Sequence, residues 1–260
     1  MNYQKSILLP LFLVSIYCFG SELKGIDEVK DALGVEIITD TTFHGTWTSV
    51  SYDKIQDTVR IINYLNLLLV EYGKYPKGYL HNVSVEKIIL CDNLIYYGQK
   101  RAAIPDPYKK ALYLEIDSNN TKNYLIHVMH HELHHCTEYS LYNDMYYKWE
   151  EWEKINISNF KYGKGGGSAY EGSNKKIDWY DMSHPVEGFV NLYSTTGEEE
   201  DRSEIVALIM NDDERYLLFK YCKDDLRLRR KVKLVLTELD KVIDAQSKYW
   251  DEKMDKIGED

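Results

Sequence analysis

The chain has 260 residues, of which 44% are hydrophobic and 13% aromatic, and its formal net charge is −10. This length and composition suit a globular protein with one large core and exclude a disordered chain, which would have fewer apolar and aromatic residues. The acidic charge argues against nucleic-acid binding, because it repels phosphate groups.

The first twenty residues have the features of an export signal. A lysine precedes an apolar run over residues 7–17, and the small residues Cys18 and Gly20 follow at positions typical of a cleavage site. We therefore expect residues 1–20 to be a signal peptide and residues 21–260 to form one domain that is secreted or periplasmic. No other stretch is long and apolar enough to span a bilayer, so no stable membrane insertion is expected after signal removal. Lipidation at Cys18 and a buried N-terminal helix are the weaker alternatives.

Three cysteines remain after the expected cleavage, namely Cys91, Cys136 and Cys222. They lack the C-x-x-C spacing of a zinc ribbon and are too few for a disulfide scaffold. One disulfide is compatible with an oxidising compartment, and the sequence leaves its pairing open.

The first half of the chain predicts a helix followed by two strands. Residues 52–72 carry apolar side chains at helical spacing, which indicates an amphipathic helix. Residues 85–97 and 110–116 are rich in apolar and β-branched residues and predict strands. A turn is expected between them, at residues 105–107, where two prolines flank an aspartate.

The second half predicts mainly helices. Several N-cap residues at 117–121 precede a segment that should be helical to about Tyr142, and residues 144–160 should continue helical. The glycines of residues 163–168 predict a loop. From Glu198 onward we expect helices with a break near Asn211, and the basic residues between positions 227 and 233 should form a solvated helix face. The fold class expected from this order is α+β, with a small mixed sheet.

The most informative stretch contains H-E-x-x-H once, as His131, Glu132 and His135. On a helix, positions i and i+4 lie on one face, so both imidazoles can bind the same ion. Zinc accepts such nitrogen donors, and a catalytic zinc site uses three protein ligands and leaves one position for water. Glu132 is rotated about 100° around the helix, and from there it can accept a proton from that water.

The histidines of this segment form two stripes. His127 lies on the face of His131 and His135, one turn before the motif, and should support a ligand without binding the ion. His130 and His134 share another face. A non-catalytic zinc-binding or zinc-buffering protein would use both stripes. This alternative function stays open, and so does a structural or interaction protein that binds no metal.

A third ligand is expected from residues 198–204, which begin a helix that can pack on the motif helix. Glu200 and Glu204 share one face of it, so one could bind zinc while the other hydrogen-bonds a ligating imidazole. Spacing alone does not choose between them. His184 is a further candidate ligand.

The H-E-x-x-H motif together with residues 193–204 resembles zincin metallopeptidases of the anthrax lethal factor catalytic-domain type and a group of bacterial zinc-binding metallopeptidases. In those proteins a later helix supplies a glutamate ligand, preceded by a tyrosine at the metal and followed by a second glutamate. The resemblance therefore implies that Glu200 is the third ligand, that Tyr193 stabilises the oxyanion formed during hydrolysis, and that Glu204 supports a ligand.

Motif and resemblance together predict a zincin-like fold, with an active-site helix followed by C-terminal helices, and a zinc-dependent endopeptidase with Glu132 as the general base. The cofactor is expected to be Zn²⁺ and the substrate a peptide or protein. The strand that contains Tyr113 and Leu114 is expected to bind an extended substrate by backbone pairing, as an edge strand can.

Overall fold

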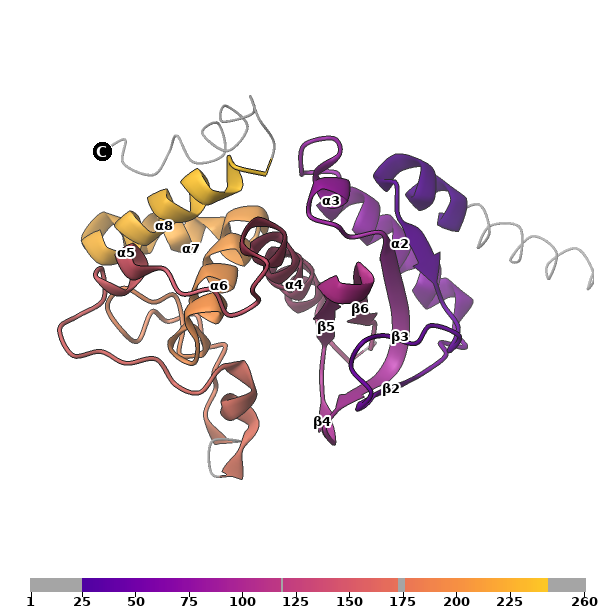
Figure 1. Ribbon diagram of the computed structural model, residues 1–260, viewed down its shortest axis with the longest axis horizontal. Helices are drawn as coiled ribbons and strands as arrows, with labels where there is room; N and C mark the ends of the chain where they lie inside the picture. Colours follow the sequence, from indigo (N-terminus) through magenta and orange to yellow (C-terminus); the bar gives the residue numbers. More distant parts are fainter. Residues whose placement is uncertain (1–24, 118, 173–175, 243–260) are drawn as a thin grey trace, which may run out of the picture.

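The computed structural model describes residues 25–117, 119–172 and 176–242 (Figure 1). The expected signal peptide lies outside the described residues. A helix over residues 25–33 precedes the sheet and its helices, which are β1 (Glu36–Ile38), β2 (Val50–Asp53), α2 (Thr58–Tyr72), α3 (Tyr79–Asn82), β3 (Lys87–Tyr96), β4 (Gln99–Lys100), β5 (Ala103–Asp106), the 3₁₀ helix η1 (Pro107–Lys109) and β6 (Ala111–Glu115). The second half contains α4 (Lys122–Tyr142), α5 (Glu150–Glu153), the 3₁₀ helices η2 (Gly166–Tyr170) and η4 (Tyr193–Thr195), α6 (Glu198–Met210), α7 (Arg215–Asp224) and α8 (Leu226–Leu239).

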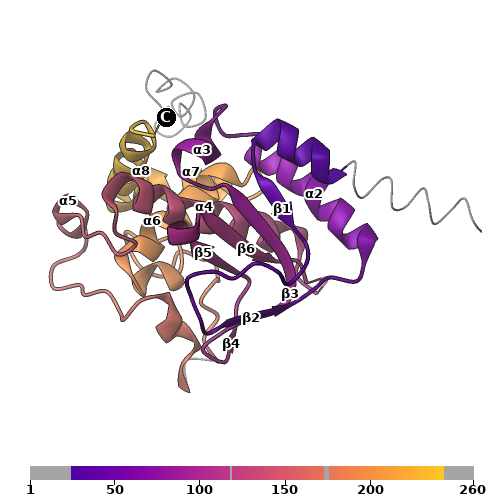
Figure 2. The ribbon, with the colours of Figure 1, turned by 45° about the vertical axis from the view of Figure 1, so that its right-hand side comes forward.

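The sheet is mixed and has the order β1–β3–β6–β5 (Figure 2). β1, β3 and β6 are parallel, whereas β5 pairs antiparallel with β6. β2 and β4 pair antiparallel with the second half of the long strand β3. This arrangement confirms the expected α+β class, and it leaves β5 at the edge of the sheet.

Alternating side chains of the sheet enter two apolar clusters, because successive residues of a strand point to opposite faces. Leu112 and Leu114 of β6 belong to the larger cluster, which includes residues of α2 and α4. Ile89 and Tyr113 point to the other face, where Phe43 packs on them. Helices therefore cover one face of the sheet, and the loop before β2 covers the other.

The interior position of β6 shows that the expected substrate strand was wrong. Tyr113 pairs with Ile89 on one side and with Ile104 on the other, and Leu114 is paired on both sides in the same way. Both residues are buried, and the backbone of β6 is used within the sheet. The expected turn was also wrong at Pro105, which lies in β5; an edge strand tolerates its missing N–H.

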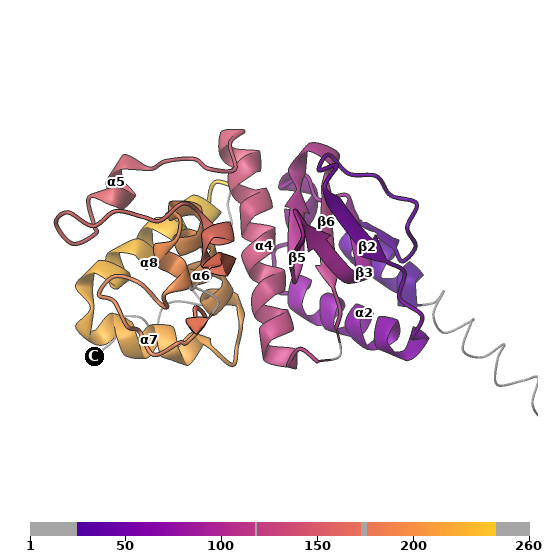
Figure 3. The same cartoon turned by 90° about the horizontal axis from the view of Figure 1, so that it is seen from below.

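Helix α4 carries the H-E-x-x-H motif and stands between the sheet and the C-terminal helices (Figure 3). Thr121 caps its N-terminus by accepting a hydrogen bond from the Tyr124 amide, and Asn143 ends it in the left-handed conformation that favours asparagine. Between residues 126 and 138 every side chain is buried except Glu132, which is half-buried. Such a helix is buried all round because both halves of the fold pack against it.

The C-terminal part confirms the expected helices after Glu198 and the break near Asn211, but two other expectations were wrong. Residues 144–160 contain only the single turn of α5, between otherwise irregular segments. Within the basic cluster, Lys231 is fully buried, and its ammonium group lies 2.6 Å from Asp201 Oδ2 and 2.8 Å from a backbone carbonyl oxygen. Position on α8, and not charge alone, decides which of these basic side chains reach solvent.

Two further findings concern the cysteines and the helices. Cys91, Cys136 and Cys222 are buried free thiols, so none of them forms the disulfide that the sequence left open. Among the described residues, no helix combines the length and apolar character needed to cross a membrane.

Candidate metal centre

Two histidines of α4 and one glutamate of α6 point toward a common position. His131 Nε2 lies 2.9 Å from Glu200 Oε2, and His135 Nε2 lies 3.4 Å from the same oxygen. The two Nε2 atoms are 3.1 Å apart. These three side chains form one of the groups in the structure that could hold a metal ion.

The separations in this group fit a single ion. Two ligands bound tetrahedrally to zinc at 2.0–2.1 Å are about 3.3 Å from each other. The three observed separations, 2.9, 3.1 and 3.4 Å, lie around that value. Two imidazoles and one carboxylate also supply nitrogen and oxygen donors that zinc accepts. The residues present therefore fit a divalent ion.

The charges in this group depend on each other. Burial would raise the pKa of Glu200, but hydrogen bonds with His131 and His135 outweigh it and hold the pKa below its usual range. Burial would likewise lower the pKa of His131, yet Glu200 and Glu204 hold it well above its usual range. Because metal-binding imidazoles are deprotonated, a divalent ion that binds this group would compete with protons for the His131 ring.

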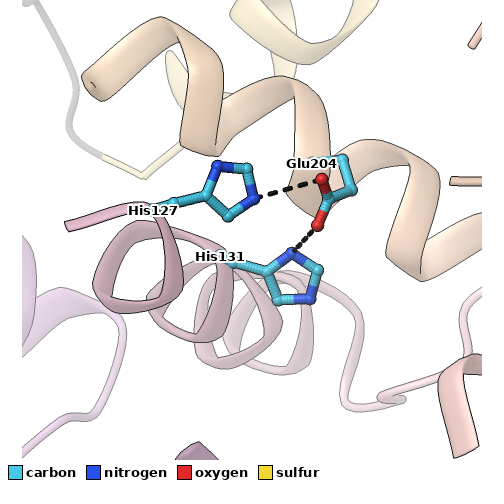
Figure 4. A group of neighbouring side chains, drawn as sticks. All are labelled: His127, His131 and Glu204. Carbon is cyan, nitrogen blue, oxygen red and sulfur yellow. Dashed lines mark hydrogen bonds and ion pairs between the residues drawn. The ribbon is translucent and has the colours of Figure 1, made fainter. Parts of the chain in front are cut away.

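Glu204 occupies the opposite side of the His131 ring and joins it to His127 (Figure 4). Glu204 Oε1 lies 2.9 Å from His131 Nδ1, and its Oε2 lies 3.1 Å from His127 Nε2. The Asn191 amide donates a hydrogen bond to Oε2 at 2.6 Å, and a carboxylate oxygen of Glu214 lies 2.7 Å from His127 Nδ1. Oε2 of Glu204 therefore accepts two hydrogen bonds, while Oε1 stands in ion-pair contact with His131 Nδ1, and this contact orients the His131 ring.

The other histidine stripe of α4 makes different contacts. The two ring nitrogens of His130 contact Tyr75 and Glu71, each at 3.0 Å, so both are occupied. The Ser203 hydroxyl lies 3.1 Å from His134 Nδ1 and 3.4 Å from His135 Nδ1, which links this stripe to the first.

Two other groups among the described residues could hold an ion: one is the buried set His127, His131 and Glu204 just described, and the other consists of His134, Glu138 and Glu238, all buried. Both carboxylate oxygens of Glu138 already accept hydrogen bonds from Arg202, whose positive charge would repel a cation. None of the three residues lines the cavity that reaches His131. This group is the poorer candidate for an exchangeable ion.

A cavity of about 580 Å³ opens over the first group. Glu132 lines it beside His131 and His135, as the one half-buried residue of that stretch of α4. Burial raises the pKa of the Glu132 carboxyl, which makes it a better proton acceptor. Strand β5 borders the same cavity, so both the carboxylate and the free edge of the sheet face one space.

Tyr193 lines this cavity beside the His131 ring. Its ring centroid is 5.9 Å from that of His131, and Tyr180 stacks on its other side at 4.7 Å. Burial raises the pKa of the Tyr193 hydroxyl well above its usual range, so the hydroxyl keeps its proton and can donate a hydrogen bond. Its position beside Glu200 comes from η4, which immediately precedes α6.

Gly166 is a site residue that the sequence did not reveal. A Cβ atom placed there would lie 2.1 Å from the Tyr193 hydroxyl and 2.2 Å from Glu200 Oε1. The absence of a side chain therefore allows the loop of η2 to pack directly on both groups. Glycine-rich composition was the only sequence signal, and it indicated a loop without showing what the loop contacts.

Gly166→Ala should therefore weaken zinc binding by about 10- to 100-fold, the range for residues that support metal ligands, and should destabilise the fold by about 1–3 kcal/mol. Zinc titration and denaturant unfolding measure the two effects. Gly167→Ala is the matched control, because a Cβ there meets Arg101 at an ordinary 3.6 Å. Equal behaviour of the two variants would show that the close packing at Gly166 has no role.

Three other residues expected at the site, Tyr113, Leu114 and His184, lie outside the cavity. Tyr113 and Leu114 belong to the interior strand and do not line the cavity. His184 contacts Asp225 at 3.2 Å and a backbone carbonyl at 2.7 Å, and it is not part of the cavity wall, so it is not a ligand candidate. Reasoning from the sequence also missed Asn191 and Glu214, whose roles arise only from contacts between distant segments.

No protein-family model matches the chain, and no curated protein matches it. The chemistry of the site therefore has to be judged from its own geometry.

Proposed function

We propose that this chain is a zinc-dependent endopeptidase of the zincin type. The observation that carries the proposal is the convergence of His131, His135 and Glu200 within 2.9–3.4 Å of one another, beneath a cavity that Glu132 also lines. The two histidines of the H-E-x-x-H motif, a glutamate from a later helix and a tyrosine before that glutamate are also what the resemblance to zincin metallopeptidases implies.

The roles of the residues follow from their positions. Zinc, when bound by His131, His135 and Glu200, would polarise a peptide carbonyl and lower the pKa of a water molecule to about 7. Glu132 accepts the proton of that water at its carboxylate and passes it to the nitrogen of the leaving amine. The Tyr193 hydroxyl donates a hydrogen bond to the oxyanion that develops on the substrate. Glu204 keeps the His131 ring in the orientation that presents Nε2.

Strand β5 is the element best placed to align the substrate. Residues 102–105 line the cavity, and β5 pairs only along one edge with β6 among the described strands. An extended peptide can pair with the other edge, as in recognition by strand addition. This assignment replaces the one based on Tyr113 and Leu114. It also keeps the expected substrate class, a peptide or protein in the secretory or periplasmic space.

Zinc buffering is the weaker function. It would need the second histidine stripe to bind ions, but both ring nitrogens of His130 are held by Tyr75 and Glu71. Glu132, which is half-buried and lines the cavity beside His131 and His135, would serve catalysis but would add nothing to zinc storage.

The proposal is tested by incubating the zinc-loaded mature chain with an unbiased peptide library, with and without a chelator. We expect cleavage at internal bonds, loss of cleavage when the chelator removes zinc, and recovery when zinc is returned. Cleavage that resists the chelator, or no cleavage by protein shown to contain zinc, would contradict the endopeptidase function. One equivalent of zinc is expected per chain, whereas buffering through both stripes would require several.

A further inference from the structure

Arg101 is a cationic side chain at the cavity wall that has no carboxylate partner among the described residues. It stands just before β5 and lines the same cavity as His131 and Glu132. Four other arginines of the described part, Arg60, Arg202, Arg215 and Arg227, are paired with acids at short range, and none of these four lines the cavity. The chain has a net charge of −10, so acidic side chains are plentiful, and yet none of the described ones pairs with this guanidinium at the cavity wall.

Two contacts hold the Arg101 guanidinium in place. One of its N–H groups donates to Gln99 Oε1 at 2.8 Å, and its central carbon lies 5.0 Å from the centre of the Tyr170 ring. Its terminal nitrogen lies near Gly167, whose loop also lines the cavity. The backbone amide of Arg101 is fixed separately by the Leu94 carbonyl. The side chain is thus ordered before any ligand arrives, which reduces the entropy lost on binding.

Most of the hydrogen-bonding capacity of Arg101 is unused. A guanidinium carries five N–H donors, and the one side-chain contact with Gln99 uses one of them. The planar arrangement of these donors matches a carboxylate, which can accept two parallel hydrogen bonds. Arg101 and Glu132 line the same cavity. Arg101 therefore lies near the group that is proposed to perform the chemistry.

We propose that Arg101 forms a carboxylate-binding subsite, which selects substrates with a negatively charged group close to the cleaved bond. This inference rests on the proposed peptidase function and adds a substrate class to it. The carboxylate can come from an aspartate or glutamate side chain or from the C-terminus of a peptide. Both sources present the same chemistry to the guanidinium, and the test separates them.

The test compares matched fluorescent peptides that contain Glu or Gln at each position around a bond that the protein cleaves, with a free or an amidated C-terminus. Wild-type protein should prefer the carboxylate by about 10- to 100-fold in kcat/KM at one position, as expected for a hydrogen bond to a charged group. In Arg101→Gln the ratio should fall to about one. In Arg101→Lys it should be intermediate, because the charge remains and the planar pair of donors is lost.

Lys164→Gln is the matched control, since Lys164 is an exposed cation that lines the same cavity. It should keep the wild-type ratio. A preference at an internal position identifies a side-chain carboxylate, and a preference for the free terminus identifies the terminal one. Equal cleavage of acidic and neutral peptides by the wild type, or an unchanged ratio in Arg101→Gln, would overturn the subsite.

A binding measurement keeps this inference separate from the function on which it rests. The zinc-loaded Glu132→Gln variant, with and without Arg101→Gln, is titrated with the same Glu and Gln peptides, and fluorescence anisotropy gives the dissociation constants. The Glu peptide should bind about 10- to 100-fold more tightly only where Arg101 is present. If no peptide is cleaved by the wild type but this difference is found, the peptidase function fails and the subsite stands. If the wild type cleaves peptides but the Glu and Gln peptides bind equally, the peptidase function stands and the subsite fails.

Discussion

Replacing Glu132 with glutamine is expected to abolish peptide cleavage while zinc stays bound. Glutamine has the same shape but cannot accept a proton, so the attack of water loses its general base. Loss of such a base typically lowers the rate by about 10²- to 10⁴-fold. Glu132 lies outside the group formed by His131, His135 and Glu200, so the metal content should not change. Steady-state kinetics and metal analysis of the same preparation measure both quantities.

Glu199→Gln is the matched control for this variant. Glu199 is another carboxylate that lines the same cavity, but it belongs to no group that could hold an ion. Its replacement should lower kcat/KM less than tenfold, because only a charge at the wall changes. If the Glu132→Gln variant cleaves peptides at the wild-type rate, Glu132 is not the base, and the proposed mechanism fails.

The second large effect is expected at Glu200. Removing its carboxylate as Glu200→Gln takes away the one anionic member of the proposed ligand group and leaves two neutral imidazoles. Zinc affinity should therefore fall by more than about 100-fold, beyond the 10- to 100-fold expected when a supporting residue such as Glu204 is changed to Gln. Competition with a chromogenic chelator measures both affinities under the same conditions.

Comparing the two glutamates resolves what the sequence left open. Glu204 contacts His131 through Nδ1 and receives hydrogen bonds from His127 and Asn191, whereas Glu200 contacts the Nε2 atoms. Denaturant unfolding of both variants shows whether a loss of zinc comes from the site or from the fold. A Glu204→Gln variant that loses zinc while Glu200→Gln retains it would reverse the assignment of ligand and supporting residue.

The sequence predicted those features of the fold that depend on local spacing. A helix has a fixed period, so the sequence alone predicts that His131 and His135 share one face. The N-cap residues before them likewise predict where the helix begins. Helix α4 and the helices after Glu198 were confirmed for that reason. The α+β class followed from the order of strands and helices. The choice of Glu200 needed the resemblance to zincins, since spacing fits Glu204 equally well.

Features that depend on contacts between distant segments could not be predicted. The segment after α4 looked helical from its Trp and Glu content, but the Trp149 amide donates to Glu198, and Trp152 packs beside Arg202. Such tertiary contacts override weak helix propensity. The buried position of Lys231 is another case, because only the folded chain brings it to Asp201.

The strand that borders the cavity was missed for a related reason. The segment of β6 is strongly apolar and was the clearer strand in the sequence, whereas β5 is short and contains Pro105. A strongly apolar sequence indicates a buried strand, and a strand buried in the centre of a sheet has no free backbone edge. An edge strand that can accept a peptide is often the weaker pattern, because its exposed side is less apolar.

The central claim, that His131, His135 and Glu200 hold one zinc ion, is tested most directly by anomalous X-ray diffraction at the zinc edge from crystals of the zinc-loaded protein. The account predicts one peak, at about 2.0–2.2 Å from His131 Nε2, His135 Nε2 and a carboxylate oxygen of Glu200. A peak at His134, Glu138 and Glu238 alone, or imidazoles of His131 and His135 that bind no common ion, would contradict it.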